Sequence, residues 1–500
     1  MFTSDNFIGI VSKTIYKSDE HQTSNITMSI INQVHVGPGG TFEASGEFST
    51  DPGEVDVLFD HLRTSDEKAI TIHFHGGLVK ESSGVKTAKM MKRVYEEANN
   101  YPLSFVWETG LLETFRQNLT SIHKTKLFQK ILKLVLKRVG ERFGGFNARG
   151  AGTPIPMDEI EEELKKEFPF ADYDQKDTGK GASRGGAIAV REENLEDIRE
   201  ELIAEFEEDI DADDEFEKLF TEKDEGVEDA SQRGIFTAAK AAAKIAKIAY
   251  RVIRRHVRDR DHGFYPTVVE EILREYYVAD LGAWVWGRMK DKAAAMWLPN
   301  DGLVGDEQRA GAYVLDAIEK LQANKDIAIN LVGHSAGAIA ICHLLAAAAA
   351  RHPGIRINHV VFLAPAVRSD LALAEVATHS DRYQQFRIFT MSDSYERDDV
   401  LVKFVYTRSL LYFISGVLEP DMVDQPIAGM MRHATQRKPF QSGAARKWAD
   451  FILDMDRTVL ADSSDLDPSA PEGRRTTSRK HGDFDNDPKT QESLQHVIKV

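Results

Sequence analysis

After residue 311, apolar strand patterns alternate with segments of helical periodicity, and this alternation narrows the possible folds most. The segments 327–333, 357–366 and 386–391 are rich in Ile, Val, Leu and Phe, and helical patterns flank the first of them. Strands separated by helices form a parallel sheet that helices cover on both faces. We therefore expect an α/β fold for this part of the chain.

The N-terminal region is expected to add strands to the same sheet. Apolar and β-branched residues gather at 7–16, 25–36, 69–77 and 102–110, and one helix is predicted among these runs. Residues 113–300 look almost wholly helical instead. Periodicity thus predicts a large helical insertion between two groups of strands.

Three parts are predicted in this chain of 500 residues. Residues 1–112 form the first part of the core, 113–300 the insertion, and 301–500 the second part of the core. The glycine-rich polar stretch 174–186 is expected to be mobile, and the polar stretch 461–480 is expected to be a linker.

Composition narrows the cellular setting. The single cysteine, Cys342, cannot form an internal disulfide or a cysteine-based zinc site, which indicates a reducing compartment. The N-terminus lacks a basic segment followed by an apolar core, so no secretory signal is expected. The apolar segments 338–350 and 401–418 are too short or too interrupted by charge to span a bilayer. We expect a cytoplasmic protein.

A serine flanked by glycines lies between a predicted strand and a predicted helix. Residues 333–337 read Gly-His-Ser-Ala-Gly, the G-x-S-x-G pattern. A serine on such a sharp turn has a strained backbone, and the glycines let neighbouring backbone approach. The helix N-terminus offers N–H groups where an oxyanion would develop. Ser335 is therefore a candidate nucleophile.

A second motif, His75-Gly76-Gly77, ends the predicted strand at 69–77. Together the two motifs resemble the α/β-hydrolase superfamily, which implies a mostly parallel sheet covered by helices. In that family a glycine-rich loop and the residue after the nucleophile supply the oxyanion hole. The resemblance assigns these donors to the backbone N–H groups of Gly77, or Gly76, and of Ala336. We expect His75 to hydrogen-bond the loop without transferring protons.

The resemblance also implies that the insertion lies between the fourth and fifth core strands, and that the triad residues follow in the order Ser, acid, His. It assigns Asp393 as the acid, because this residue follows the predicted strand at 386–391. Three neighbouring carboxylates stay open as alternatives: Glu396, Asp398 and Asp399.

His481 is assigned as the base because it lies after the acid and six residues before Asp487, which is predicted to cap a final helix that begins at Pro488. His433 is the alternative. Asp483, Asp485 and Asp487 echo the start of a calcium loop, but Pro488 occupies the glycine position, so we interpret them as helix capping and solvated charge.

The insertion carries two basic amphipathic helices, predicted at 124–139 and 236–258, and an acidic run at 191–230 with 20 acidic against 4 basic residues. Two interpretations stay open. The basic faces answer the acidic run, or they lie on an anionic membrane surface as part of a lid over the active site. The net charge of −17 argues against a nucleic-acid partner.

These features predict a serine hydrolase of the esterase or lipase type that acts on an acyl-containing small molecule or lipid. Membrane contact, if present, would be peripheral. Neither a metal nor an organic cofactor is expected. Amide or thioester cleavage, or lyase or haloperoxidase chemistry, on the same scaffold stays open. The alternative from another class is a catalytically inactive scaffold that binds a partner.

Overall fold

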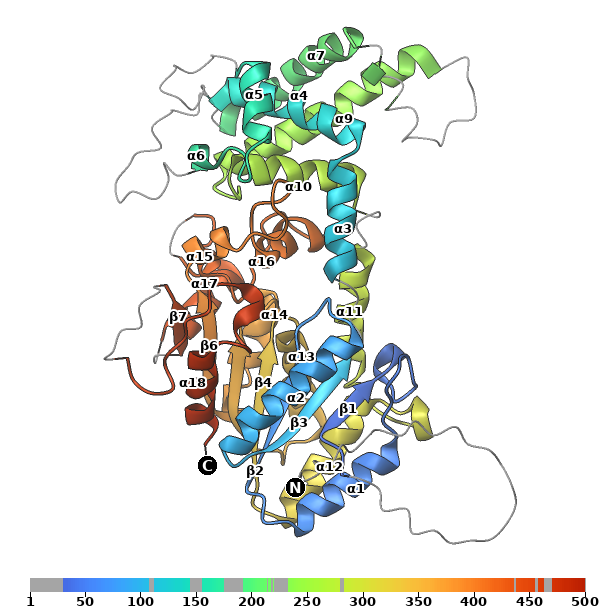
Figure 1. The fold of residues 1–500 in the computed structure, drawn as a ribbon, viewed down its shortest axis with the longest axis vertical. Coiled ribbons are helices and arrows are strands. Elements are labelled where there is room, and N and C mark those ends of the chain that lie inside the picture. The colour runs from blue at the N-terminus through green and yellow to red at the C-terminus, as the bar shows by residue number, and fades with distance from the viewer. Residues whose placement is uncertain are drawn as a thin grey trace, which may run out of the picture.

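Seven parallel strands form the sheet at the centre of the molecule (Figure 1). The computed structural model describes residues 30–107, 112–143, 155–174, 192–213, 215–216, 219, 233–278, 283–435, 438–454, 457–462 and 470–499. The predicted strand at 7–16 and residues 175–186 of the predicted mobile stretch lie outside the described residues.

The spatial order of the strands is β1-β3-β2-β4-β5-β6-β7, and every neighbouring pair is parallel. The strands are β1 (Gln33–Val36), β2 (Ala69–Phe74), β3 (Tyr101–Trp107), β4 (Ala328–His334), β5 (Ile357–Leu363), β6 (Tyr383–Met391) and β7 (Thr458–Ala461). This confirms the predicted α/β class. Phe74 of β2 lies opposite Gly333 of β4, so the loops that follow these two strands meet at the carboxyl edge of the sheet.

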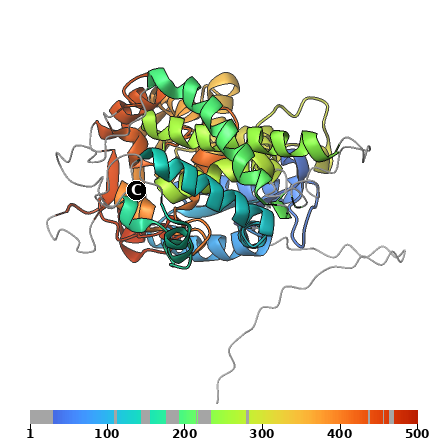
Figure 2. The same cartoon turned by 90° about the horizontal axis from the view of Figure 1, so that it is seen from above.

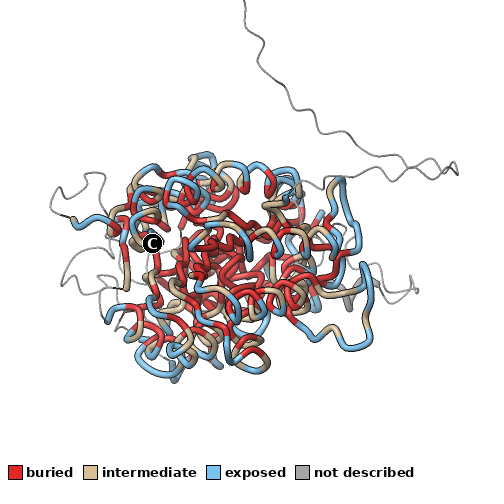
Figure 3. Tube along the Cα trace, turned by 90° about the horizontal axis from the view of Figure 1, so that it is seen from below, coloured by how far each residue is buried: buried red, intermediate tan, exposed pale blue. Residues whose placement is uncertain are grey.

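Helices cover both faces of the sheet, as the fold class requires. Alternate residues of the central strands join separate apolar clusters: Val332 and Val361 pack on one face, Leu331 and Val360 on the other. The first face carries α2 (Glu81–Glu97) and α18 (Pro488–Ile498). The second carries α1 (Pro52–Thr64), α12 (Ala310–Asn324), α13 (Gly337–Arg351) and α17 (Gly443–Leu453). Buried residues accordingly fill the interior between the layers (Figure 3).

A block of helices lies beyond the carboxyl ends of the strands (Figures 1 and 2). Its helices follow β3 and precede β4 in the chain, and their described residues add no strand to the sheet. They are α3 (Leu112–His123), α4 (Lys126–Phe143), α5 (Met157–Leu164), α6 (Ala171–Asp174), α7 (Leu195–Asp211), α9 (Arg233–Val257), α10 (Phe264–Tyr276) and α11 (Ala283–Ala295). The chain enters the block through α3 and returns to the sheet through α11 (Figure 1).

The basic residues of α4 and α9 pair with acidic residues of the same block. The pairs are Lys130–Asp213 at 2.6 Å, Lys133–Glu161 at 2.6 Å, Lys137–Asp209 at 3.1 Å, Arg251–Glu275 at 2.8 Å and Arg258–Glu192 at 2.7 Å. These contacts fit the interpretation in which the basic faces of the two helices form ion pairs with acidic residues of the insertion. Membrane contact stays a prediction. No helix within the described ranges combines the length and the apolar character needed to cross a bilayer.

Residues 30–100 contain two α-helices, α1 and α2, where the sequence pattern predicted one. The missed helix α1 begins with a capping box. Asp51 accepts a hydrogen bond from the N–H of Glu54, the Glu54 carboxylate accepts one from the N–H of Asp51, and Pro52 is the first helical residue. The cap predicted for the last helix is confirmed, since the side chain of Asp487 accepts from the N–H of Thr490.

Candidate active site

Ser335 occupies the turn between β4 and α13 with a strained backbone, as the motif predicts. Its φ is +52°, in the left-handed region that residues other than glycine seldom adopt. The N–H of Ser335 donates to the carbonyl of Leu363 at 2.9 Å, and its own carbonyl accepts from the N–H of Ala366 at 3.0 Å. The end of β5 and the loop after it therefore hold the strained turn in place.

The two glycines of the motif are required for close backbone approach. A Cβ on Gly337 would lie 2.1 Å from the carbonyl oxygen of Phe74, and a Cβ on Gly333 would lie 2.8 Å from the carbonyl carbon of Gly337. Both contacts involve backbone atoms, which cannot move aside as a flexible side chain can. Glycine at 337 thus lets the turn lie against the end of β2, and glycine at 333 lets the start of α13 pack against the end of β4.

The glycine loop after β2 lies directly beside Ser335. A Cβ on Gly76 would lie 3.4 Å from the Cβ of Ser335, and one on Gly77 would lie 2.8 Å from the Cβ of Ala336. Within the described part of the chain, the N–H groups of Gly77 and Ala336 have no hydrogen-bond acceptor. The three residues predicted for the oxyanion hole, Gly76, Gly77 and Ala336, therefore lie next to Ser335. The N–H groups of Gly77 and Ala336 are available as hydrogen-bond donors.

His75 ties this loop to β3. Its Nδ1 donates to the carbonyl of Gly76 at 2.7 Å, and its Nε2 accepts from the N–H of Trp107 at 3.2 Å. Burial lowers the pKa of His75 to about 4, so the ring is neutral at physiological pH. Both ring nitrogens are occupied, which is the loop-holding role expected from the sequence.

The helical block reaches the same loop through α11. The sulfur of Met289 lies 2.4 Å from where a Cβ on Gly77 would be. Farther along α11, Lys290 pairs with the buried carboxylate of Glu419 at 2.8 Å. The block is therefore anchored on the sheet domain next to the candidate site.

His481 and Ser335, 146 residues apart in the sequence, are hydrogen-bonded at their side chains. The Nε2 of His481 lies 2.7 Å from the Oγ of Ser335, and the two residues are 6% and 5% exposed. Burial and the nearby His334 lower the pKa of His481 to about 3, against the attraction of Asp485. A neutral imidazole within hydrogen-bond distance of a serine hydroxyl has the geometry of a general base.

The carboxylate of Asp393, the predicted acid, is bonded to a residue other than His481. Its Oδ1 accepts a hydrogen bond of 2.6 Å from the hydroxyl of Tyr412. The Nδ1 of His481 is buried and has no partner among the described residues. The carboxylate bonded to His481 belongs instead to Asp399, whose Oδ2 accepts from the main-chain N–H of His481 at 2.7 Å.

The remaining alternatives have other partners. Glu396 is buried and accepts from the hydroxyl of Ser409, and burial raises the pKa of Glu396 to about 8. Asp398 is exposed. His433, the alternative base, lies 2.9 Å from Asp424 through its Nε2 and accepts from the N–H of Ile427 through its Nδ1.

Two residues beside His481 were not among the predicted site residues. His334 donates from its Nε2 to the carbonyl of His481 at 2.9 Å, and its Nδ1 lies 3.4 Å from the Oδ2 of Asp485. Asp485 is only 5% exposed, so its interpretation as solvated charge is wrong. Residues near Asp485 in the sequence do not indicate this burial, because the compensating partner, His334, lies at the end of β4. The position of His334 inside the G-x-S-x-G motif was the one sequence feature that could have pointed to it as a site residue.

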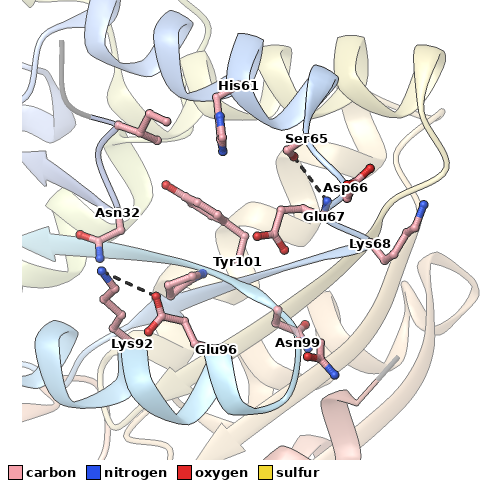
Figure 4. A pocket seen from close by; sticks show the side chains of 13 residues that line it. Asn32, His61, Ser65, Asp66, Glu67, Lys68, Lys92, Glu96, Asn99 and Tyr101 are labelled. Carbon is pink, nitrogen blue, oxygen red and sulfur yellow. Dashed lines mark hydrogen bonds and ion pairs between the residues drawn. The ribbon is translucent and has the colours of Figure 1, made fainter. Parts of the chain in front are cut away.

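A separate cavity of about 900 Å³ lies at the opposite edge of the sheet (Figure 4). It is lined by residues at the amino ends of β2 and β3, among them Glu67 and Tyr101, and by His61 of α1. Ser335 follows the carboxyl end of β4, so this cavity does not belong to the candidate site.

In the ranges that the structure describes, no group of three or more His, Cys, Asp or Glu side chains is arranged to hold a metal ion. Comparisons of the chain with family models, with curated proteins and with solved structures find no match.

Proposed function

We propose that this protein is a serine hydrolase that cleaves acyl bonds, with Ser335 as the nucleophile and His481 as the base. The observation that carries the proposal is the hydrogen bond of 2.7 Å between the Oγ of Ser335 and the Nε2 of His481, at a turn where Ser335 has a φ of +52°. Two residues so far apart in sequence meet here with the geometry that activates a serine.

The reaction would proceed in two stages. The Oγ of Ser335 attacks the acyl carbon while the Nε2 of His481 takes its proton, and the N–H groups of Gly77 and Ala336 stabilise the oxyanion. The protonated His481 then gives the proton to the leaving oxygen. In the second stage, water attacks the acyl-serine ester with His481 again acting as the base, which releases the acid and restores Ser335.

Strand order supports the resemblance to the α/β-hydrolase superfamily. The strand followed by Gly76 and Gly77 is hydrogen-bonded to the strand followed by Ser335. This is the arrangement that oxyanion loop and nucleophile require in that family. On this proposal β3 and β4 are the fourth and fifth core strands, and the helical block is the insertion between them.

We assign Asp399, in place of Asp393, to the role of orienting His481. Asp399 is already bonded to the main chain of His481, while the Nδ1 of the same residue is buried without a partner. A carboxylate at Nδ1 fixes the tautomer whose Nε2 can accept the serine proton, and it stabilises the imidazolium that forms. Among the four candidate carboxylates at 393–399, that of Asp399 is the one bonded to His481, and this contact is the ground for the assignment.

Carboxylic esters, including lipids, are the proposed substrates. The buried, apolar side chain of Met289 from α11 packs against the oxyanion loop, so the helical block contributes an apolar contact next to the reacting centre. Such a surface suits an acyl chain better than a charged group.

A fluorophosphonate probe tests the proposal directly, because it reacts covalently with activated serines. The folded parent should be labelled, and the variants Ser335→Ala and His481→Gln should not. Ser65→Ala, a half-buried serine at the opposite edge of the sheet, is the matched control and should be labelled like the parent. Acid release from acyl esters of two to twelve carbons would then define the substrate. Absence of labelling in the folded parent, or equal labelling of Ser335→Ala, would contradict the proposal.

A further inference from the structure

His334 connects two points of the loop that carries the proposed base. Its Nε2 donates to the main-chain carbonyl of His481 at 2.9 Å, and its Nδ1 faces the Oδ2 of Asp485 at 3.4 Å. The imidazole of His334 therefore fills the space between the start and the middle of the segment 481–487, which also caps α18 through Asp487.

Both partners of this contact are buried and fixed. His334 is 7% and Asp485 5% exposed, and the Oδ1 of Asp485 accepts from the side-chain amide of Asn486 at 3.1 Å. His334 is the last residue of β4 and directly precedes Ser335. One residue of the sheet thus holds the loop of the base at a fixed distance from the nucleophile.

We propose that His334 and Asp485 are positioning residues, which hold the main chain of His481 so that its imidazole stays within hydrogen-bond distance of Ser335. The inference rests on the proposed function, since it concerns the geometry of the same site. It goes beyond the hydrolase motif, because the second position of G-x-S-x-G, His334, and Asp485, four positions after the base, then act through each other.

The charge state of His334 should matter for this contact. Burial alone would lower the pKa of His334, but the carboxylate of Asp485, aided by the carbonyl of His481 and by Asp483, raises it above its ordinary value. Burial, with the charge on His334 as a smaller cause, lowers the pKa of His73 to about 3 and that of His75 to about 4, so these two neighbouring rings stay neutral. With a proton on both nitrogens, His334 can donate to His481 and to Asp485 at once. As pH rises through its pKa, the ring keeps one N–H and loses one contact.

Four variants test whether His334 and Asp485 position His481 or only fill space in the core. Asp485→Asn keeps the shape and removes the charge. His334→Gln keeps an N–H donor near the position of Nε2 and cannot titrate. The double change His334→Leu with Asp485→Asn removes both contacts without leaving a buried charge. His352→Gln is the control, because His352 is also buried and carboxylate-paired, with Glu319 at 3.0 Å, but lies at the far end of α13.

The rate of fluorophosphonate labelling and the kcat and KM for a cleaved ester are measured from pH 5 to 10, with folding checked by circular dichroism. We expect Asp485→Asn and the double variant to lower the labelling rate and kcat by about 10- to 100-fold with little change in KM, because a misplacement of about 1 Å costs on this scale. The labelling rate of the parent should fall at alkaline pH as His334 deprotonates. His334→Gln should lack this alkaline fall, and His352→Gln should follow the parent.

Equal labelling rates and pH profiles in the parent, Asp485→Asn and the double variant would overturn the inference. Hydrogen exchange of residues 481–487 tests the same contact independently of activity, and the double variant should exchange faster there than the parent. Failure of the parent to react with the probe would contradict the proposed function alone, whereas unchanged exchange in the double variant would contradict the positioning role alone.

Discussion

The main-chain N–H of His481 donates a hydrogen bond of 2.7 Å to the Oδ2 of Asp399, across 82 residues of sequence. Asp393, which follows the end of β6 by two residues and was predicted to be the acid, instead accepts a hydrogen bond of 2.6 Å from the hydroxyl of Tyr412. The carboxylates of Asp399 and Asp393 therefore have different hydrogen-bond partners. Substituting each one separately tests which of them orients His481.

We expect Asp399→Asn to lower the fluorophosphonate labelling rate by about 10³- to 10⁴-fold, because an amide can still accept from the main chain but cannot hold the correct tautomer of His481. Asp393→Asn keeps an acceptor for Tyr412 and should label at close to the parental rate. A large loss in Asp393→Asn together with a small one in Asp399→Asn would return the acid role to Asp393.

Gly337, the last residue of the G-x-S-x-G motif, gives a steric prediction. Gly337→Ala would put a Cβ 2.1 Å from the carbonyl oxygen of Phe74, so β2 and β4 could not keep their spacing. We expect this variant to lose about 2 kcal/mol or more of unfolding free energy, together with labelling by the probe. Gly287→Ala in α11, where a Cβ meets nothing within 4 Å, should be neutral or more stable by up to about 1 kcal/mol. Urea unfolding of both variants is the measurement, and a parent-like Gly337→Ala would contradict the steric argument.

A buried charge network joins the helical block to the sheet domain. Asp424 has three partners there: His262 at 3.0 Å, His433 at 2.9 Å and Arg432 at 3.2 Å. We expect Asp424→Ala to cost about 3 to 5 kcal/mol of unfolding free energy, because it leaves two buried histidines and the largely covered guanidinium of Arg432 without their carboxylate.

The same network has a defined pH dependence. Burial alone would raise the pKa of Asp424, but Arg432, His262 and His433 hold it well below its ordinary value. Its stabilising contribution is therefore present above the ordinary aspartate pKa and is lost as pH falls below it. Denaturant unfolding at pH 7 and pH 3 should show a smaller difference between parent and Asp424→Ala at pH 3, which lies below the ordinary aspartate pKa. Asp326→Ala, at a fully exposed position, is the control and should match the parent at both.

Glu396 should make the protein less stable as pH rises. Burial raises the pKa of this carboxyl group to about 8, so the folded protein keeps a proton that the unfolded chain releases near pH 4.5. Between these values the folded state binds more protons than the unfolded state, and the free energy of unfolding falls with pH by up to about 1.4 kcal/mol per unit from this group. Glu396→Gln cannot ionise, so it should gain stability relative to the parent between pH 5 and pH 8. Identical denaturant midpoints for the two proteins across that range would contradict this assignment.

Local sequence was sufficient for the parts of the site that depend on neighbouring residues. The strand, the strained turn at Ser335 and the helix that follows were all predicted, because a turn that admits only small residues at positions 333 and 337 leaves a pattern within five residues. The cap at Asp487 was predicted for the same reason. His481 was found through its order in the chain relative to Ser335, which the family resemblance supplied.

Local sequence could not show which of the four carboxylates at 393–399 is bonded to His481. Whether Asp393 or Asp399 faces His481 depends on how the short helix α15 (Asp393–Asp398) is rotated against a loop that arrives more than eighty residues later. The same limit hid Asp485, whose burial is tolerated only because His334 of β4 lies opposite it. Sequence by itself determined the backbone turn and the residue types of the site, since these follow from short-range sterics. Only the tertiary structure decided which charged groups meet, because the free energy of a buried charge depends on partners that the chain brings from elsewhere.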